Sequence, residues 1–261
     1  GLSLFVRKTK PIRFTRAGEH ILELADKVIP QLEQTSRDIK KLAGGQAGRL
    51  HMAIECHSCF DWLMPAINSF RDQWPEVEID LMASFHFEPL PALARGELDL
   101  VVTADPTPMP GIHYQPLFRY QALLAIANQD NLTDKKYIEA KDLAQQTLIH
   151  YPVERKRLDI FTQFLDPSSI EPSSTRQADL TLMIVQLVAS GRGVACLPNW
   201  ALQPYLDAGL ISSRPLGEKG IWPILYAAIR EEQIDSSFMK DFLKQSLLSC
   251  NNNLAGIEPL K

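Results

Sequence analysis

The sequence of 261 residues contains no apolar run that approaches the roughly 20 residues needed to span a bilayer. Its start also lacks the pattern of a signal peptide, because Arg7, Lys8 and Lys10 are followed by polar residues and by no apolar stretch. From these two absences we expect a cytoplasmic protein with no membrane partner.

Cysteine is scarce, and the four cysteines do not resemble the disulfide framework of a small secreted protein. The sequence also shows no P-loop, no GxGxxG fingerprint and no Ser-His-Asp arrangement. The Gly191-Arg192-Gly193 segment precedes a predicted strand and not a helix, so it does not form a phosphate loop. We therefore expect a protein that is not an enzyme and has no cofactor or metal site.

Acidic residues are missing from residues 1–16, which hold Arg7, Lys8, Lys10, Arg13 and Arg16. Because the whole chain has a net charge of -4, the remainder is more acidic than the total suggests. A basic head on an acidic body favours a local contact with a polyanion. A solvated basic hairpin without a partner is the alternative, and charge alone does not decide between them.

A long helix is predicted from Arg16 to about Leu42, after two short strands in residues 4–14 and an N-cap at Thr15. Its apolar positions recur at alternating spacings of four and three, the heptad pattern of a helix that packs along another helix. Pro30 is expected on the outer face. The favoured partner is the same helix of a second chain, and packing on its own domain is the alternative. The stripe consists of Ile21, Ala25, Val28, Leu32, Thr35, Ile39 and Leu42.

The rest of the chain alternates predicted strands and helices after a Gly-rich linker at 44–48. Strand, helix, strand, helix and strand over 50–103 are typical of parallel βαβ units. Two consecutive strands then lead to a second βα series at 146–197, and a strand and a closing helix follow at 224–248. This pattern predicts an α/β fold of two lobes with a cleft between them, and a disordered tail from Asn251 onward.

Several segments resemble the LysR-type bacterial transcriptional regulators, and the resemblance covers nearly the whole chain. A subset is similar to the members that regulate methionine biosynthesis in response to homocysteine. The general family features are Leu4–Arg7 and Phe14–Gly18 for the wing and linker helix, Gly96–Val102 for the first effector lobe and Gly191–Pro198 for the second. The features of the methionine subgroup are Ile54–Cys59, Trp62, Trp74-Pro75, Tyr151–Arg155 and Leu225–Arg230.

The resemblance implies a two-lobed, periplasmic-binding-protein-like effector domain preceded by a wing remnant and a long linker helix. The implied parts are a wing remnant at 1–15, a linker (dimerisation) helix and hinge at 16–48, an effector-binding domain at 49–250 and a tail at 251–261. Lobe 1 would take about 49–122 and 225–250, and lobe 2 about 123–224. The implied partners are promoter DNA, a small amino-acid effector, namely homocysteine, and further copies of the chain in a dimer or tetramer.

One feature departs from the family, whose members carry a complete winged helix-turn-helix before the linker helix. Here no recognition helix precedes the wing, so we expect a fragment of a longer protein. Such a fragment should bind DNA weakly and without sequence preference, because phosphate contacts carry no direct sequence information. The residues expected to contact the DNA backbone are Arg7, Lys8, Lys10 and Arg13.

Cys56-His57-Ser58-Cys59 is the sharpest local motif, and it lies between a predicted strand and a helix N-terminus. Thioredoxin-like enzymes place a CxxC there, where the helix stabilises a thiolate. A thiol–disulfide redox protein using Cys56 and Cys59 is therefore the alternative function. Zinc binding is disfavoured because no second CxxC or histidine pair lies at metal spacing. The plain interpretation is a loop at the cleft edge with small buried thiols.

Several ends of elements converge on the predicted cleft, which favours a ligand site. Backbone N–H groups near Ser58 and the hydroxyl of Thr103 would bind a carboxylate, and Asp105 or Asp179 an ammonium. For Ser58 or Asp179 alone a plain helix cap is an equal alternative, and core packing is favoured for Phe85. Glu97 and Asp99 are expected to be structural. The predicted effector-binding residues are His57, Ser58, Cys59, Phe85, Thr103, Asp105, Tyr151 and Asp179.

Overall fold

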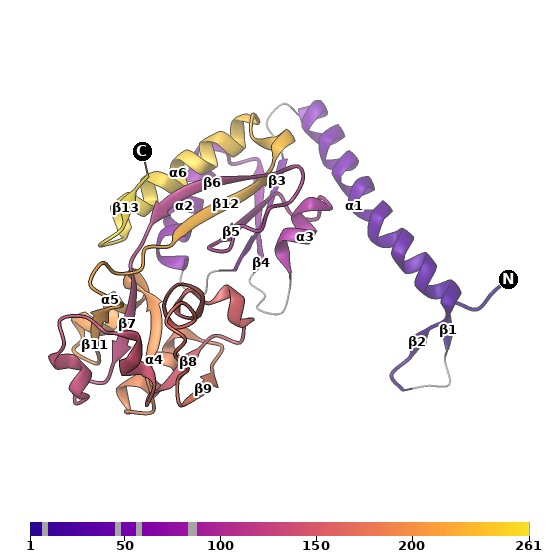
Figure 1. The fold of residues 1–261 in the computed structure, drawn as a ribbon. Coiled ribbons are helices and arrows are strands. Elements are labelled where there is room, and N and C mark those ends of the chain that lie inside the picture. The colour runs from indigo at the N-terminus through magenta and orange to yellow at the C-terminus, as the bar shows by residue number, and fades with distance from the viewer. Residues whose placement is uncertain (7–9, 45–47, 56–58, 83–87, 261) are drawn as a thin grey trace.

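The helix α1 (Arg16–Gly44) forms a long arm that extends from the rest of the chain (Figure 1). It begins where predicted, because Thr15 Oγ1 accepts a hydrogen bond from the N–H of Gly18 at 3.1 Å. The strands β1 (Phe5–Val6) and β2 (Arg13–Phe14) pair as an antiparallel hairpin before it. This computed structural model describes residues 1–6, 10–44, 48–55, 59–82 and 88–260. Across these ranges, no helix combines the length and apolar character that crossing a membrane requires.

The arm meets the body through the face opposite its apolar stripe. Pro30 is buried, and Arg37 Nη2 donates a hydrogen bond to the carbonyl oxygen of Gly96 at 2.7 Å. The expectation that Pro30 lies on the outer face is therefore wrong, since this side of α1 faces the first lobe. The large apolar stripe residues up to Ile39, whose side chains the structure describes, stay exposed and do not pack on the chain's own lobes. The exposed members of the stripe are Ile21 at 51%, Val28 at 37%, Leu32 at 63% and Ile39 at 60%.

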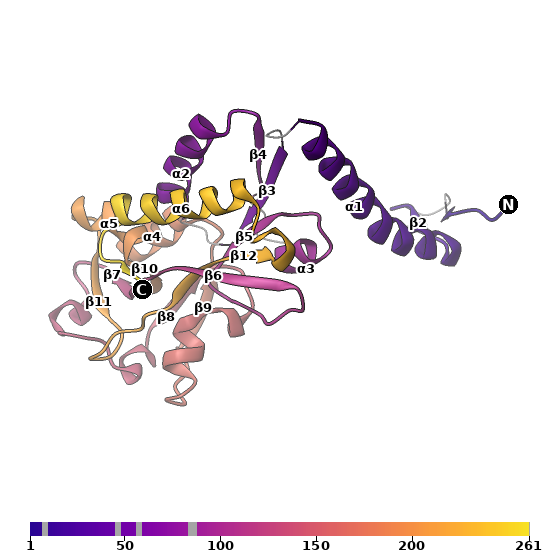
Figure 2. The ribbon, with the colours of Figure 1, turned by 90° about the horizontal axis from the view of Figure 1, so that it is seen from above.

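The first lobe is built on a six-stranded sheet with the order β13-β6-β12-β5-β3-β4. Its strand β3 pairs in parallel with β4 and β5, as predicted for βαβ units, while β12 is antiparallel to β5 and β6. The helices α2 and α6 lie side by side over one face of this sheet (Figure 2). The strands are β3 (Gly48–Ile54), β4 (Val77–Met82), β5 (Leu100–Thr103), β6 (Ile112–Arg119), β12 (Ile224–Arg230) and β13 (Glu258–Pro259), and the helices are α2 (Phe60–Gln73), α3 (Pro89–Ala94), η5 (Glu231–Gln233) and α6 (Ser237–Asn253).

The second lobe contains an antiparallel sheet with the order β10-β7-β11 and a parallel pair, β8-β9. The helix predicted at 155–165 is divided into a 3-10 turn, η3, and a π-helix, η4. The strands are β7 (Ala122–Ile126), β8 (Thr147–His150), β9 (Ser174–Gln177), β10 (Ala195–Pro198) and β11 (Ser212–Pro215). The helices are η1 (Asn131–Asp134), η2 (Ala140–Leu143), η3 (Arg155–Arg157), η4 (Ile160–Leu165), α4 (Thr181–Ala189) and α5 (Asn199–Asp207).

Two strand crossings join the lobes, one between β6 and β7 and the other between β11 and β12. The crossings run side by side, because the N–H of Tyr120 donates to Pro223 O and the N–H of Ala122 to Ile221 O, both at 3.0 Å. Each lobe has its own apolar core on either side of them. The lobes are therefore connected by two short backbone links next to the cleft.

The C-terminal segment is ordered, so the expected disordered tail is wrong. α6 continues to Asn253, and β13 pairs with β6 at the edge of the first sheet. Asn199 Nδ2 also donates hydrogen bonds to the carbonyl oxygens of Ala255 and Gly256, at 3.0 and 2.8 Å. Side-chain and backbone hydrogen bonds thus fix a polar segment that has few apolar residues of its own.

A buried ion pair stabilises the first lobe next to β5, in the family segment Gly96–Val102. Asp99 is 2% exposed, and its Oδ1 accepts hydrogen bonds from Arg230 Nη2 at 3.2 Å and from Gln233 Nε2 at 3.1 Å. Its Oδ2 accepts the N–H of His51 at 2.9 Å. These contacts are structural, as expected for Asp99.

The family segment Gly191–Pro198 of the second lobe depends on the close approach of the Gly193 backbone to that of Thr147. Gly193 has φ +145°, and a Cβ atom there would collide with the carbonyl oxygen of Thr147. The approach lets the N–H of Val194 donate to Thr147 O at 2.9 Å. A glycine at position 193 therefore lets the chain before β10 pair with β8.

Candidate ligand-binding site between the lobes

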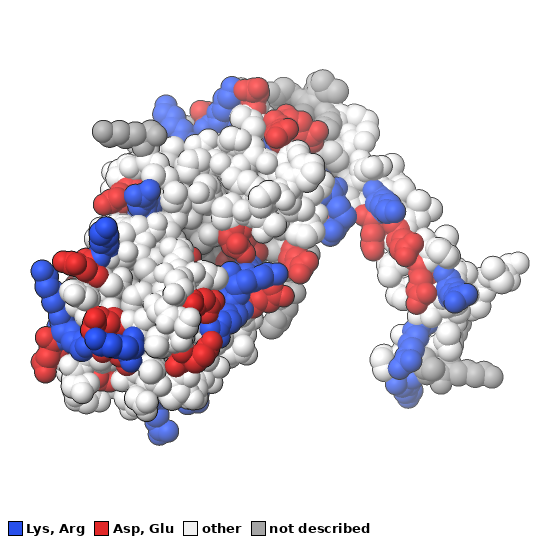
Figure 3. Space-filling view, viewed as in Figure 1, with Lys and Arg blue, Asp and Glu red and all other residues white. Residues whose placement is uncertain are grey.

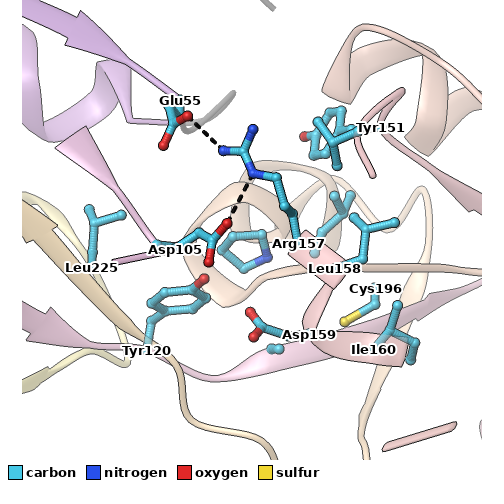
Figure 4. A pocket seen from close by; sticks show the side chains of 15 residues that line it. Glu55, Asp105, Tyr120, Tyr151, Arg157, Leu158, Asp159, Ile160, Cys196 and Leu225 are labelled. Atoms are coloured by element: carbon cyan, nitrogen blue, oxygen red, sulfur yellow. Dashed lines mark hydrogen bonds and ion pairs between the residues drawn. The ribbon is translucent and has the colours of Figure 1, made fainter. Parts of the chain in front are cut away.

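A cavity of about 140 Å³ lies between the two lobes. A volume of this size has room for roughly ten non-hydrogen atoms, if each takes about the space of one water. Both lobes and both crossings contribute to its wall (Figure 4). The lining residues are Glu55, Ala104, Asp105, Tyr120, Ala122, Tyr151, Val153, Arg157, Leu158, Asp159, Ile160, Cys196, Leu197, Pro198 and Leu225.

The cavity lies at the carboxyl ends of parallel strands in the first lobe. Glu55 directly follows β3, and Asp105 follows β5 after a single residue, Ala104. These ends are where open α/β sheets bind ligands. Thr103 is completely buried, and its hydroxyl accepts a hydrogen bond from the N–H of Asp105 at 3.0 Å. Thr103 therefore supports the loop that presents Asp105.

Arg157 connects the two lobes across this cavity. Its Nη2 donates to Glu55 Oε1 at 2.7 Å, and its Nε donates to Asp105 Oδ2 at 3.1 Å (Figure 4). Arg157 belongs to η3 of the second lobe, whereas both carboxylates follow strands of the first. Charge-assisted bonds of this kind are stronger than neutral ones, so this cluster helps to set how the lobes lie together.

Two polar groups of the wall have no hydrogen-bond partner among the described residues. Glu55 Oε2 is buried without a donor. The Tyr120 hydroxyl points toward Asp105 in Figure 4, and this side chain is only 6% exposed. Buried polar groups are usually paired, so unpaired groups on a cavity wall indicate that a ligand or water supplies the partner.

Burial raises several pKa values in the cavity. Burial raises the pKa of Asp159 to about 6; the bond from Gln163 opposes this shift, and the charge of Asp105 adds to it. Burial also raises the pKa of Tyr151 to about 12 and that of the Cys196 thiol well above its ordinary value. Acidic and basic side chains occur together at the junction of the lobes (Figure 3). Among the described residues, no three His, Cys, Asp or Glu side chains are grouped to hold a metal ion.

The structure brings two of the predicted site residues, Asp105 and Tyr151, to the cavity wall. The Tyr151 hydroxyl shares a hydrogen bond of 2.7 Å with Thr181 Oγ1, at the start of α4. Thr103 lies behind the wall, and Asp179 is exposed just before α4. Cys59 is completely buried and disulfide-bonded at the N-terminus of α2.

Other predicted residues lie outside the described residues, namely His57, Ser58 and Phe85 of the effector set and Arg7 and Lys8 of the DNA set. Lys10 and Arg13, from the DNA set, are described and exposed on the hairpin. No ion pair to a described residue occupies either of these two side chains.

Sequence reasoning missed Glu55, Tyr120, Arg157, Asp159 and Cys196. Glu55 could have been found, because it ends a predicted strand, just as Asp105 follows the next predicted parallel strand. Arg157 and Asp159 were assigned to a regular helix, and only the break between η3 and η4 directs both toward the cleft.

Comparisons with known proteins agree with this architecture. The family model of the LysR substrate binding domain matches residues 43–248. The transcriptional regulator MetR of Escherichia coli K12 is 43% identical over 246 residues, which cover 94% of this chain and 76% of the relative. MetR of Haemophilus influenzae is 37% identical over 260 residues, which cover 100% of this chain and 84% of that protein.

Solved structures share the fold. The regulatory domain of MetR from Neisseria meningitidis has a TM-score of 0.75 and 39% identity, and the match covers 82% of this chain and 98% of that one. Full-length BenM, at 18% identity, shares the fold with a TM-score of 0.67 over 97% of this chain and 83% of its own. The chain therefore belongs to the LysR-type transcriptional regulators, which are DNA-binding proteins and not enzymes, and its two lobes are their periplasmic-binding-protein-like effector-binding domain.

Proposed function

We propose that this chain is the effector-sensing and oligomerisation part of a cytoplasmic regulator of methionine biosynthesis, with L-homocysteine as its co-effector. The relatives named MetR support the regulated pathway. The observation that carries the sensing role is the cavity between the lobes, which combines charged groups with an apolar wall.

The cavity suits a small amino acid in both size and charge. Arg157 offers a guanidinium to a carboxylate, and Glu55, Asp105 and Asp159 offer carboxylates to an ammonium. Leu158, Ile160 and Leu197 supply apolar surface for a short thiol side chain. These groups come from both lobes, so a bound effector would contact both and change how they lie together.

A direct structural connection leads from the cavity to the arm. β5 runs from the Asp105 loop back to Asp99, which is held by Arg230, and Gly96 precedes this strand. Arg37 of α1 donates its hydrogen bond to Gly96 O. A lobe movement that shifts β5 would therefore act on the arm at this contact.

The arm has the features of a self-association element. Its exposed apolar residues from Ile21 to Ile39 form one stripe along the helix and are not scattered singly. The same helix of a second chain would cover this stripe in a dimer or tetramer. The hairpin at the end of the arm carries basic side chains (Figure 3). We propose that Lys10 and Arg13 contact the phosphates of promoter DNA there.

The thiol–disulfide alternative gains no support from the described cysteines. An active thiol is partly exposed and has a lowered pKa. Cys59 is 0% exposed and disulfide-bonded. Burial raises the pKa of Cys196 and of Cys250. Cys59 therefore lacks the exposure of an active thiol, and Cys196 and Cys250 lack the lowered pKa.

Isothermal titration with L-homocysteine under reducing conditions tests the proposal, with L-methionine and L-cysteine as competitors. We expect saturable binding of homocysteine. Asp105→Asn should weaken it about tenfold, because the ammonium loses a charged partner. Asp166→Asn is the matched control, since Asp166 pairs with Arg155 outside the cavity. Absence of homocysteine binding, or equal affinities of the two variants, would contradict the proposal.

A further inference from the structure

The cluster formed by Arg157, Glu55 and Asp105 separates two hollows. The inter-lobe cavity of about 140 Å³ lies on one side, and a groove of about 510 Å³ lies on the other. These three residues and Val153 line both. A ligand that extends from the groove into the cavity would therefore meet this cluster.

The charges of the cluster do not balance. Two carboxylates face one guanidinium, and Glu55 Oε2 is buried with no donor among the described residues, although Oε1 is paired. The nearby ammonium of Lys156 is already paired with Glu154 at 2.7 Å. A buried carboxylate oxygen without a partner is costly, so the cluster has room for one further cation.

Arg157 in turn keeps a free donor. Its Nε and Nη2 are used, while Nη1 makes no hydrogen bond to a described residue. A guanidinium presents a fork that binds a carboxylate through two parallel bonds. A ligand carboxylate could replace the carboxylate of Glu55 or Asp105 on Arg157 and bind the guanidinium through two parallel bonds. The displaced carboxylate would then be free to bind a cation.

We propose that this cluster is an internal substitute for the zwitterion of an α-amino acid. The α-carboxylate of the ligand takes Arg157, and its α-ammonium takes Glu55 together with Asp105. The side chain of the ligand then lies in the inter-lobe cavity, against Leu158, Ile160 and Leu197. This assignment rests on the proposed function, and it adds which residue recognises which group of the effector.

Truncated ligands test the assignment group by group. The desamino analogue of homocysteine is 4-mercaptobutanoic acid, and the decarboxylated analogue is 3-mercaptopropylamine. Each should bind the wild-type chain about ten- to hundredfold more weakly than L-homocysteine, because each lacks one charged contact. Arg157→Met should weaken the binding of L-homocysteine by a similar factor. Removal of the carboxylate from the ligand should then weaken binding no further in this variant. In Glu55→Gln, removal of the amine should cost less affinity than in the wild type, because only Asp105 remains to bind the ammonium.

Matched controls come from the neighbouring ion pair. Lys156→Met and Glu154→Gln make the same changes at residues that line only the groove, and they should keep the wild-type response to both analogues. Thermal melting checks that each variant is folded. If Arg157→Met does not fold, Arg157→Lys serves in its place; it keeps the charge but loses the fork, so it should weaken homocysteine and reduce the effect of the missing carboxylate.

The outcomes separate this inference from the proposed effector. If Arg157→Met still loses affinity by the wild-type factor when the carboxylate is removed, the inference is overturned while homocysteine remains the effector. If L-methionine or L-cysteine binds and L-homocysteine does not, the proposed effector fails, and the same cycle with the bound amino acid decides the inference. If none of the three amino acids binds, both are overturned.

Discussion

Arg157 Nη2 lies 2.7 Å from Glu55 Oε1, and this pair joins two lobes across 102 positions of sequence. The contact is made at the cavity wall and beside the two strand crossings, which are the covalent links between the lobes. A ligand that competes for either side chain therefore acts where the relative position of the lobes is determined.

The first prediction concerns which hollow holds the ligand. Ala104 is exposed and lines only the inter-lobe cavity, whereas Thr107 lines only the groove. Ala104→Leu should weaken homocysteine binding at least about tenfold by filling space the ligand needs, whereas Thr107→Leu should have little effect. Calorimetric titration measures both. A larger loss in Thr107→Leu would place the ligand in the groove.

The second prediction concerns the pH dependence of stability. Burial raises the pKa of Asp159 to about 6 from an ordinary value of 3.8. Between these values the folded chain keeps a proton that the unfolded chain releases, so rising pH destabilises the fold, and the loss is complete above about pH 6. Asp159→Asn removes the effect and keeps an acceptor for Gln163. It should increase the free energy of unfolding at pH 7.5 by about 1–3 kcal/mol.

Urea denaturation of the wild-type chain and of Asp159→Asn at several pH values measures this difference. The advantage of the variant should shrink as the pH falls through 6 and vanish near pH 4, provided that both proteins remain folded there. An advantage that is the same at pH 7.5 and pH 4.5 would show that Asp159 is ionised in the folded state, contrary to the effect of burial.

The third prediction concerns the buried ion pair next to β5. Arg230→Met would leave the Asp99 carboxylate buried beside only neutral donors, so the free energy of unfolding should fall by about 3–5 kcal/mol. Arg95→Met is the matched control, because Arg95 pairs with Glu97 at the surface and should lose less than about 1 kcal/mol. Chemical denaturation measures both losses of unfolding free energy, and the loss in Arg230→Met should be the larger. Equal losses in the two variants would mean that Arg230→Met does not leave Asp99 as an uncompensated charge.

The fourth prediction concerns the arm. Replacing Val28 and Leu32 by Glu puts two charges into the exposed stripe and should shift sedimentation toward a smaller species. His20→Glu with Lys27→Glu is a control on exposed polar positions outside the stripe, and it should sediment like the wild type. If both double variants sediment alike, the stripe does not hold copies of the chain together.

Local patterns were sufficient to predict much of this fold. The cap at Thr15, the βαβ units around β3 and the crossing strands all follow from periodicity, turn residues and apolar runs in short windows. Elements without such signals were missed. α5 contains Pro204, β11 is short and polar, and β13 is two residues long and ends in Pro259.

The candidate site was predictable only in part. Asp105 and Tyr151 follow strands, so their place at the cleft could be inferred from topology. Arg157 could not be found this way, because its role depends on two carboxylates that approach it from the other lobe. Thr103 stays a predicted ligand contact; in the structure its hydroxyl accepts a hydrogen bond from the backbone N–H of Asp105, a local bond that no sequence pattern distinguishes from a ligand contact.

The most direct test of the central claim is a crystal structure of this chain grown with L-homocysteine under reducing conditions. We expect the amino acid in the inter-lobe cavity, with its carboxylate on Arg157 and its ammonium on Glu55 and Asp105. A cavity that stays empty at saturating homocysteine, with the Arg157–Glu55 pair intact, or a ligand bound outside the cleft, would contradict the account.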